Sequence, residues 1–241
     1  MNSDEYEKMA RVETRHWFYV GKRQIARWAI ERFEGDIADG ALLDCGAGTG
    51  IFAQELSASR RVKVMDDHDE SLTVLRQRFP DNAVVEGSCT AIPLSDASET
   101  CVTLLDVLEH VEDDRAAVKE FHRVLKPGGL LVITVPAMMQ LWSDWDQALH
   151  HFRRYSRSGL AALFHDAQWE QCYLKYVNTA AFPAVWWMRR GRRSEDAVRQ
   201  EDRLPPNWLN HVLRWLFVWP AVRRWCPAPF GVGLIIVLRK R

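Results

Sequence analysis

A turn with glycine at alternate positions constrains the fold of this chain more than any other feature. Apolar residues 41–43 lead into the turn, and residues 51–56 after it continue with helical spacing. This pattern predicts a strand, a tight turn carrying Gly46, Gly48 and Gly50, and a helix. Glycine permits positive φ and lets a ligand approach without meeting a Cβ, and the free N–H groups at a helix start suit an anionic group. The turn is therefore predicted to hold a nucleotide-like cofactor.

The detail of the turn discriminates between cofactors. A dinucleotide fingerprint counted from Gly46 would place its last small residue at position 51, where this chain has the bulky Ile51. A nicotinamide-dependent oxidoreductase is thereby the less favoured alternative. The D-x-G-x-G-x-G run that begins at Asp44 resembles motif I of the class I S-adenosylmethionine (SAM) dependent methyltransferases. That resemblance implies SAM as cofactor and S-adenosylhomocysteine as product, with the methionyl part of SAM beside Asp44, Gly46, Ala47, Gly48 and Gly50.

Two further segments match a bound nucleoside. Residues 62–66 predict a second strand that ends in Asp66, about 20 residues beyond the first glycine, where an acidic side chain binds a ribose diol. Asp67 follows it, and the alternative is that this acidic run favours the start of the next helix. The family often has a Gly-Asp-Ala loop against adenine, at the position that this chain fills with Ser88, Cys89 and Thr90. A serine hydroxyl binds the adenine amino group more weakly than a carboxylate, and a plain turn is the alternative.

The fourth predicted strand, residues 100–107, runs into Asp106, Val107 and Leu108, which resemble motif IV beside the sulfonium and the acceptor. His110 follows as a candidate general base, with a structural hydrogen bond as the alternative. The chain lacks the D/N-P-P-Y/F/W arrangement of nucleic acid and protein amide methyltransferases and the Pro-Cys of cytosine-carbon enzymes. These absences direct the prediction towards small acceptors.

A second constellation lies beyond the predicted fifth strand at 130–135. The pattern L-W-S-x-x-D followed by H-x-R-R-Y resembles a branch of small-molecule and lipid-pathway methyltransferases, matched at Asp146, His151, Arg153, Arg154 and Tyr155. An arginine pair can clamp a phosphate or carboxylate, and a histidine or tyrosine can accept or relay a proton. The alternative is a buried ion pair between the aspartate and an arginine that fixes the loop.

Aromatic residues gather at both ends of the chain. Trp17 and Tyr19 belong to an N-terminal aromatic cluster that either packs in the core or covers the acceptor. Residues 178–230 carry six of the 11 tryptophans around a charged stretch at 192–203. Short helices rich in Trp and Arg suit a membrane interface or the roof of an apolar pocket, and a homodimer surface has a similar composition.

Composition bounds the remaining possibilities. A net charge of +0 lacks the positive excess that nucleic-acid-binding proteins usually carry, so no nucleic acid partner is expected. The five cysteines include no C-x-x-C, so no metal site or disulfide framework is expected. A reducing cytoplasm is expected, with peripheral membrane contact as a variant, and the polar start of the chain carries no secretory signal.

The resemblance implies an α/β fold with a Rossmann-like, seven-stranded doubly wound sheet, an antiparallel last strand, helices on both faces and a helical insertion between strands six and seven. The predicted parts are an N-terminal lid (1–36), a SAM-binding core (37–177), a Trp-rich insertion (178–230) and the last strand with its tail (231–241). The predicted function is methyl transfer from SAM to a small, lipophilic or anionic acceptor by in-line displacement. A non-catalytic SAM-fold protein at a membrane is the other alternative.

Overall fold

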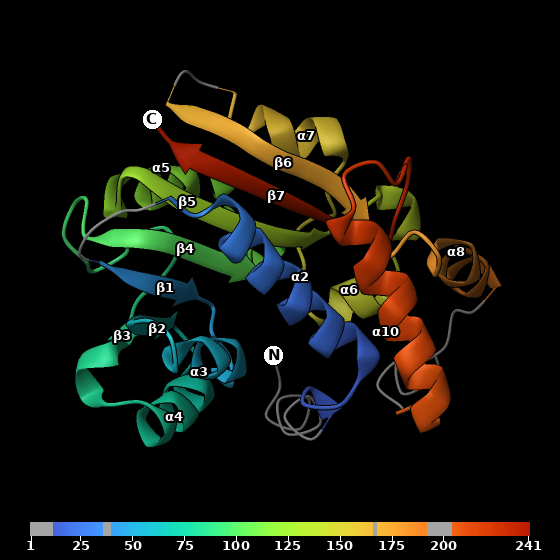
Figure 1. The fold of residues 1–241 in the computed structure, drawn as a ribbon, viewed down its shortest axis with the longest axis horizontal. Helices are drawn as coiled ribbons and strands as arrows, with labels where there is room; N and C mark the ends of the chain where they lie inside the picture. Colours follow the sequence, from blue (N-terminus) through green and yellow to red (C-terminus); the bar gives the residue numbers. More distant parts are fainter. Residues whose placement is uncertain (1–11, 36–39, 166–167, 192–203) are drawn as a thin grey trace.

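A single seven-stranded sheet organises the computed structural model, which describes residues 12–35, 40–165, 168–191 and 204–241 (Figure 1). The strand order is β3-β2-β1-β4-β5-β7-β6, with β7 antiparallel to both of its neighbours and the other pairs parallel. The strands are β1 (Ala41–Cys45), β2 (Val62–Asp66), β3 (Val84–Glu86), β4 (Glu99–Leu105), β5 (Leu125–Pro136), β6 (Trp169–Val177) and β7 (Gly233–Lys240). The predicted fold class is confirmed.

Helices cover both faces of the sheet because successive side chains of the buried strands alternate between the faces. Leu43 faces a core that includes Phe121 and Leu160, whereas Leu42 faces a second core with Ile25 and Phe52. The helices are α2 (Trp17–Phe33), α3 (Ile51–Ser57), α4 (Asp69–Arg78), α5 (Asp114–Val124), α6 (Asp144–Ala148), α7 (Arg157–Ala162), α8 (Phe182–Gly191) and α10 (Asn207–Val222). The sheet is therefore buried on both sides, as a mostly parallel sheet must be.

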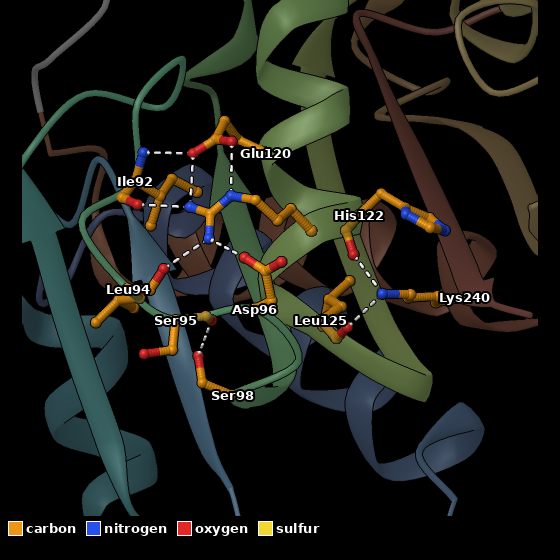
Figure 2. Close-up of polar contacts among 10 residues, drawn as sticks. Ile92, Leu94, Ser95, Asp96, Ser98, Glu120, His122, Leu125 and Lys240 are labelled. Carbon is orange, nitrogen blue, oxygen red and sulfur yellow. Dashed lines mark hydrogen bonds and ion pairs between the residues drawn. The ribbon is translucent and has the colours of Figure 1, made fainter.

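The loop between β3 and β4 is anchored from α5. The Arg123 guanidinium donates to the carbonyl oxygens of Ile92 and Leu94, each at 2.7 Å, and to Asp96 at 2.8 Å. Glu120 accepts from the same guanidinium and from the Ile92 N–H at 2.7 Å; Figure 2 shows this carboxylate beside the Ile92 backbone. The clamp fixes the segment directly after Ser88–Thr90.

The predicted insertion forms α8 and α10, and α10 packs along α2 (Figure 1). The Phe217 ring is 2% exposed and stacks on Phe18 at 5.7 Å between centroids. The Asn210 amide joins the same helices, because it accepts from the Trp17 N–H and donates to the Arg15 carbonyl, both at 2.8 Å. The N-terminal helix α2 and the insertion helix α10 therefore pack together as one layer, which is called the cover below.

Neither insertion helix meets the length and hydropathy of a membrane span, and the same holds for every other helix within the described ranges. The charged stretch predicted at 192–203 lies outside the described residues.

Replacing Phe217 with alanine is expected to lower the free energy of unfolding by about 3–5 kcal/mol, because a buried aromatic ring leaves a cavity. Chemical denaturation followed by circular dichroism measures the change. Trp208→Ala is the matched control on the same helix, since Trp208 is 68% exposed, and it should change stability by less than about 0.5 kcal/mol. Equal losses in the two variants would contradict the packing of α10 on α2.

Candidate functional site

One large cavity of about 1210 Å³ lies at the carboxyl ends of β1, β2 and β4. The glycine turn, the loops after β2, β3 and β4, and helix α2 line it, together with Met188 of α8 and Phe217 of α10. Ligands of open α/β sheets bind at this edge of the sheet. The volume exceeds that of a usual single-ligand pocket, so a nucleotide-sized cofactor and a second molecule fit together.

The glycine turn has the conformation that its sequence predicts. Gly46, Gly48 and Gly50 have φ values of +64°, +57° and +76°. A Cβ on Gly46 would lie 2.6 Å from the Val107 side chain, and one on Gly50 would lie 2.6 Å from the Phe79 ring. Positive φ and close packing both require glycine here, and Gly46 and Gly48 line the cavity with backbone alone.

Two carboxylates flank the turn. Asp66 accepts hydrogen bonds from the backbone N–H groups of Gly48 at 2.9 Å and Asp67 at 3.0 Å, which fixes the end of β2 against the turn. Asp44 accepts from the Thr103 hydroxyl at 2.6 Å. Burial raises the pKa of Asp44 to about 7, with a further contribution from the charge of Asp66. Asp44 therefore changes charge close to neutral pH when the cavity holds no ligand.

Lys22 reaches the cavity from α2 and forms an ion pair with Asp106. Asp106 has a positive φ of 57° directly after β4, and its carboxylate also accepts from the Thr134 hydroxyl at 2.9 Å. Burial opposes ionisation, but the Lys22 charge and these hydrogen bonds outweigh it and lower the pKa of Asp106. Sequence reasoning missed Lys22, because a single lysine in an amphipathic helix carries no signal.

Two histidines and a glutamate meet at another part of the cavity wall. The rings of His110 and His151 lie 4.6 Å apart between centroids, edge to face. Desolvation by the surrounding protein, with a contribution from His151, lowers the pKa of His110 to about 4. Glu109 is fully buried and lines the same cavity, and neither of its carboxylate oxygens has a hydrogen-bond partner elsewhere in the described chain. Burial, aided by the charge of Asp106, raises the pKa of Glu109.

Asp146 lies behind this wall rather than in it. Its carboxylate is fully buried and accepts from His151 Nδ1 at 3.0 Å, Arg154 Nε at 2.7 Å and Arg189 Nη1 at 3.2 Å. Burial alone would raise its pKa, yet the hydrogen bond from His151 and the two arginine charges hold the pKa at about 2. This geometry matches the alternative to ligand binding that the sequence offered, a buried ion pair that fixes the loop. Arg189 adds a second arginine to that pair, and sequence reasoning missed it.

The cavity brings together most of the predicted site residues. Those that line it are Trp17, Tyr19, Asp44, Gly46, Ala47, Gly48, Asp66, Asp67, Ser88, Cys89, Thr90, Asp106, Val107, His110, His151 and Arg154. Among the residues predicted to contact a ligand, Gly50, Leu108, Asp146, Arg153 and Tyr155 do not line it.

Two of these placements correct the predicted roles. The Tyr155 hydroxyl donates to Asp114 at 3.1 Å and contacts the Leu108 carbonyl at 3.4 Å, and the tyrosine side chain is part of the core. Arg153 pairs with the same Asp114 at 2.8 Å. Both side chains fix the loop from outside the cavity, so neither is placed to relay a proton or clamp an anion. Glu109 is a third site residue that sequence reasoning missed, after Lys22 and Arg189; an acid between the apolar Leu108 and the candidate base His110 was the available signal.

Comparison with known proteins covers the first five strands. Residues 43–133 match the family model described as a methyltransferase domain. A probable S-adenosylmethionine-dependent methyltransferase of Mycolicibacterium smegmatis is 30% identical over 132 residues, which are 54% of this chain and 51% of that relative. A demethylmenaquinone methyltransferase of Chlorobaculum tepidum is 34% identical over 113 residues, 46% of each chain. The chain thus spans about half the length of the curated relatives it matches.

Solved structures share the fold over nearly the whole chain. A SAM-dependent methyltransferase from Thermotoga maritima aligns with a TM-score of 0.62 and 19% identity over 99% of this chain and 96% of that one. A cyclase aligns with a TM-score of 0.55 and 17% identity over 90% of this chain and 80% of that one. Similarity at this level shows the fold and leaves the reaction open. Residues 43–133, with the glycine turn at their start, are a class I SAM-dependent methyltransferase domain.

Proposed function

We propose that this protein transfers the methyl group of SAM to a small, lipophilic or anionic acceptor. The observation that carries the proposal is the backbone hollow at Gly46–Gly48, which opens into one cavity with Asp44 and Asp66 on either side. Bare backbone beside a helix start suits the carboxylate of the methionyl group. Carboxylates suit the ribose hydroxyls and the positive charges of the cofactor.

The assignment of cofactor contacts follows the walls of the cavity. Asp66 is proposed to bind the ribose diol, and the segment Ser88–Thr90, held by the Arg123 clamp, to lie against adenine. Asp106 and Val107 are proposed to lie beside the sulfonium and the acceptor. These assignments are supported by position, because each residue with an assigned contact lines the cavity at the carboxyl end of a strand or in the loop that follows that strand.

The chemistry needs alignment more than activation. The carbon–sulfur bond breaks as the acceptor atom bonds to the methyl carbon, and the electron pair returns to sulfur, which becomes a neutral thioether. The protein has to hold the acceptor in line with that bond and exclude water. A hydroxyl acceptor also loses a proton, for which His110 and His151 remain the candidate acceptors on the cavity wall.

The character of the acceptor is inferred from the rest of the cavity. Aromatic and apolar side chains line the part below the cover, among them Trp17, Phe18, Tyr19, Met188 and Phe217. The relative that is 34% identical is named for demethylmenaquinone. Both observations support an acceptor with an apolar part.

Binding of SAM tests the cofactor assignment directly. Isothermal titration of the full chain should show one SAM site, and Gly48→Arg should abolish it, because a long side chain at positive φ would fill the cavity. Gly35→Arg is the matched control, since a Cβ there meets no atom within 4 Å. Mass spectrometry of extract incubated with isotope-labelled SAM then identifies the acceptor.

The outcomes separate the candidate functions. SAM binding without transfer to any extract component would favour the non-catalytic alternative. NADH binding in place of SAM binding would overturn the proposal in favour of an oxidoreductase.

The affinity for SAM should rise with pH up to about neutrality. Asp44 has a pKa of about 7 in the free protein, and the positive charges of the cofactor lower that pKa in the complex. Binding below pH 7 therefore releases a proton, and binding above pH 7 does not. Titration in buffers of different ionisation enthalpy measures this proton, and Asp44→Asn should remove it. Asp81→Asn, at an exposed acid outside the cavity, is the control that should retain it.

The insertion is proposed to contact a membrane surface. Four of its tryptophans, Trp187, Trp208, Trp215 and Trp225, are 58–76% exposed. Such rings bind the interface of a bilayer. The protein should cosediment with anionic liposomes, and the combined Trp187→Ala and Trp208→Ala variant should cosediment less. A dimer by light scattering without liposome binding would assign these residues to a subunit interface instead.

A further inference from the structure

We propose that Glu109, His110 and His151 form a binding site for a divalent transition-metal cation. One potential ligand atom from each residue lies within 4.8 Å of the others. Ligands bound tetrahedrally to one ion at roughly 2.1 Å lie about 3.4 Å apart, so the three ligand atoms would have to close by up to about 1.4 Å. All three line the cavity.

The donor set selects the class of metal. Two imidazole nitrogens and one carboxylate oxygen suit Zn²⁺, Fe²⁺, Co²⁺ or Mn²⁺, whereas Mg²⁺ and Ca²⁺ prefer oxygen ligands alone. Three protein ligands leave further coordination positions open, as in sites that bind a reacting molecule. The five cysteines include no C-x-x-C and led to the expectation of no metal site, but this donor set contains no cysteine, and His151 is distant along the chain from the other two residues.

The carboxylate of Glu109 is the group that points to a bound cation. The side chain is fully buried, and beyond the backbone of Glu109 itself neither carboxylate oxygen has a hydrogen-bond partner in the described chain. Buried polar groups are nearly always paired, because an unpaired one retains its full desolvation cost. A cation between Glu109 and the two rings would satisfy these oxygens.

His151 is oriented as a metal ligand would be. Its Nδ1 lies 3.0 Å from the Asp146 carboxylate, which can only accept, so Nδ1 carries the proton and the lone pair lies on Nε2. A carboxylate that fixes the tautomer of a ligating histidine is the usual outer partner of such a ligand. Asp146 is itself held by Arg154 and Arg189. The buried ion pairs of Asp146 with Arg154 and Arg189 would then orient a metal ligand as well as fix the loop.

The charges around the proposed site do not oppose a cation. Lys22 is paired with Asp106, and Arg154 is paired with Asp146. A second group, Asp66, Asp67 and His68, also has ligand atoms within 4.8 Å, but His68 and Asp67 are exposed and the Asp66 oxygens accept backbone hydrogen bonds. The second group carries no proposal and serves as a control.

The site extends the proposed function, on which this step rests. Open coordination positions in the cavity that is proposed to hold SAM suit an acceptor with an oxygen donor, such as a hydroxyl or a pair of neighbouring oxygens. The cation would orient that oxygen and lower its pKa; His110 and His151 would then hold the cation instead of accepting the proton, which would pass to water.

Cobalt titration of the full chain tests the site. Co²⁺ should produce visible d–d absorption that saturates at one equivalent, without the thiolate charge-transfer band that binding to Cys89 would give. Glu109→Gln and His151→Ala should each weaken Co²⁺ binding at least about 10-fold, and Asp146→Asn by about 10–100-fold. His68→Ala should bind Co²⁺ like the unchanged protein. Circular dichroism of each variant checks that it folds, and His110→Ala replaces any variant that does not.

SAM titration of the same samples separates the two proposals. SAM binding with no cobalt absorption, or with equal Co²⁺ affinity in Glu109→Gln, would overturn the metal site and leave the proposed function standing. Saturable cobalt absorption without SAM binding would overturn the proposed function alone.

Discussion

The parallel pairing of β1 with β2 and β4 is the constraint on which the site depends. Asp44 pairs in register with Val64 on one side and Thr103 on the other. This register brings the carboxyl ends of three strands to one edge of the sheet. Asp44 is the residue before the last of β1, Asp66 is the last residue of β2, and Asp106 directly follows β4. Three carboxylates converge on one cavity only because the strands are parallel, since antiparallel neighbours would place their ends at opposite edges.

The sheet and the cofactor side of the site could be predicted from sequence because their signals are local. Gly46–Gly50 encode a turn through backbone conformation, and Asp66 and Asp106 come directly at or after an apolar strand. Each of these features is complete within about ten residues. Parallel topology then supplies the rest, because it fixes where every strand end lies.

The acceptor side of the site could not be predicted from the sequence, because its contacts join segments that lie far apart along the chain. Lys22 pairs with Asp106 and Arg189 with Asp146, and neither pair has a shared motif. The run at 151–155 suggested ligand contacts for every polar residue, yet Arg153 and Tyr155 turn to Asp114 outside the cavity. A motif specifies which residues are present, and the direction of each side chain depends on the helix packed behind it.

The hydrogen bonds between Asn210 and the N-terminal segment have a consequence for biosynthesis. They join residues 193 and 195 positions apart, and β7 enters the sheet between β5 and β6 from the far end of the chain. A nascent chain that has formed its first five strands still lacks β6 and β7 at one side of the sheet, and it lacks α8 and also α10, which completes the cover above the cavity. Contacts of such high sequence separation form late and slowly. A chain still emerging from the ribosome therefore holds the cofactor turn without an enclosed place for the acceptor, and the two halves of the site mature at different times.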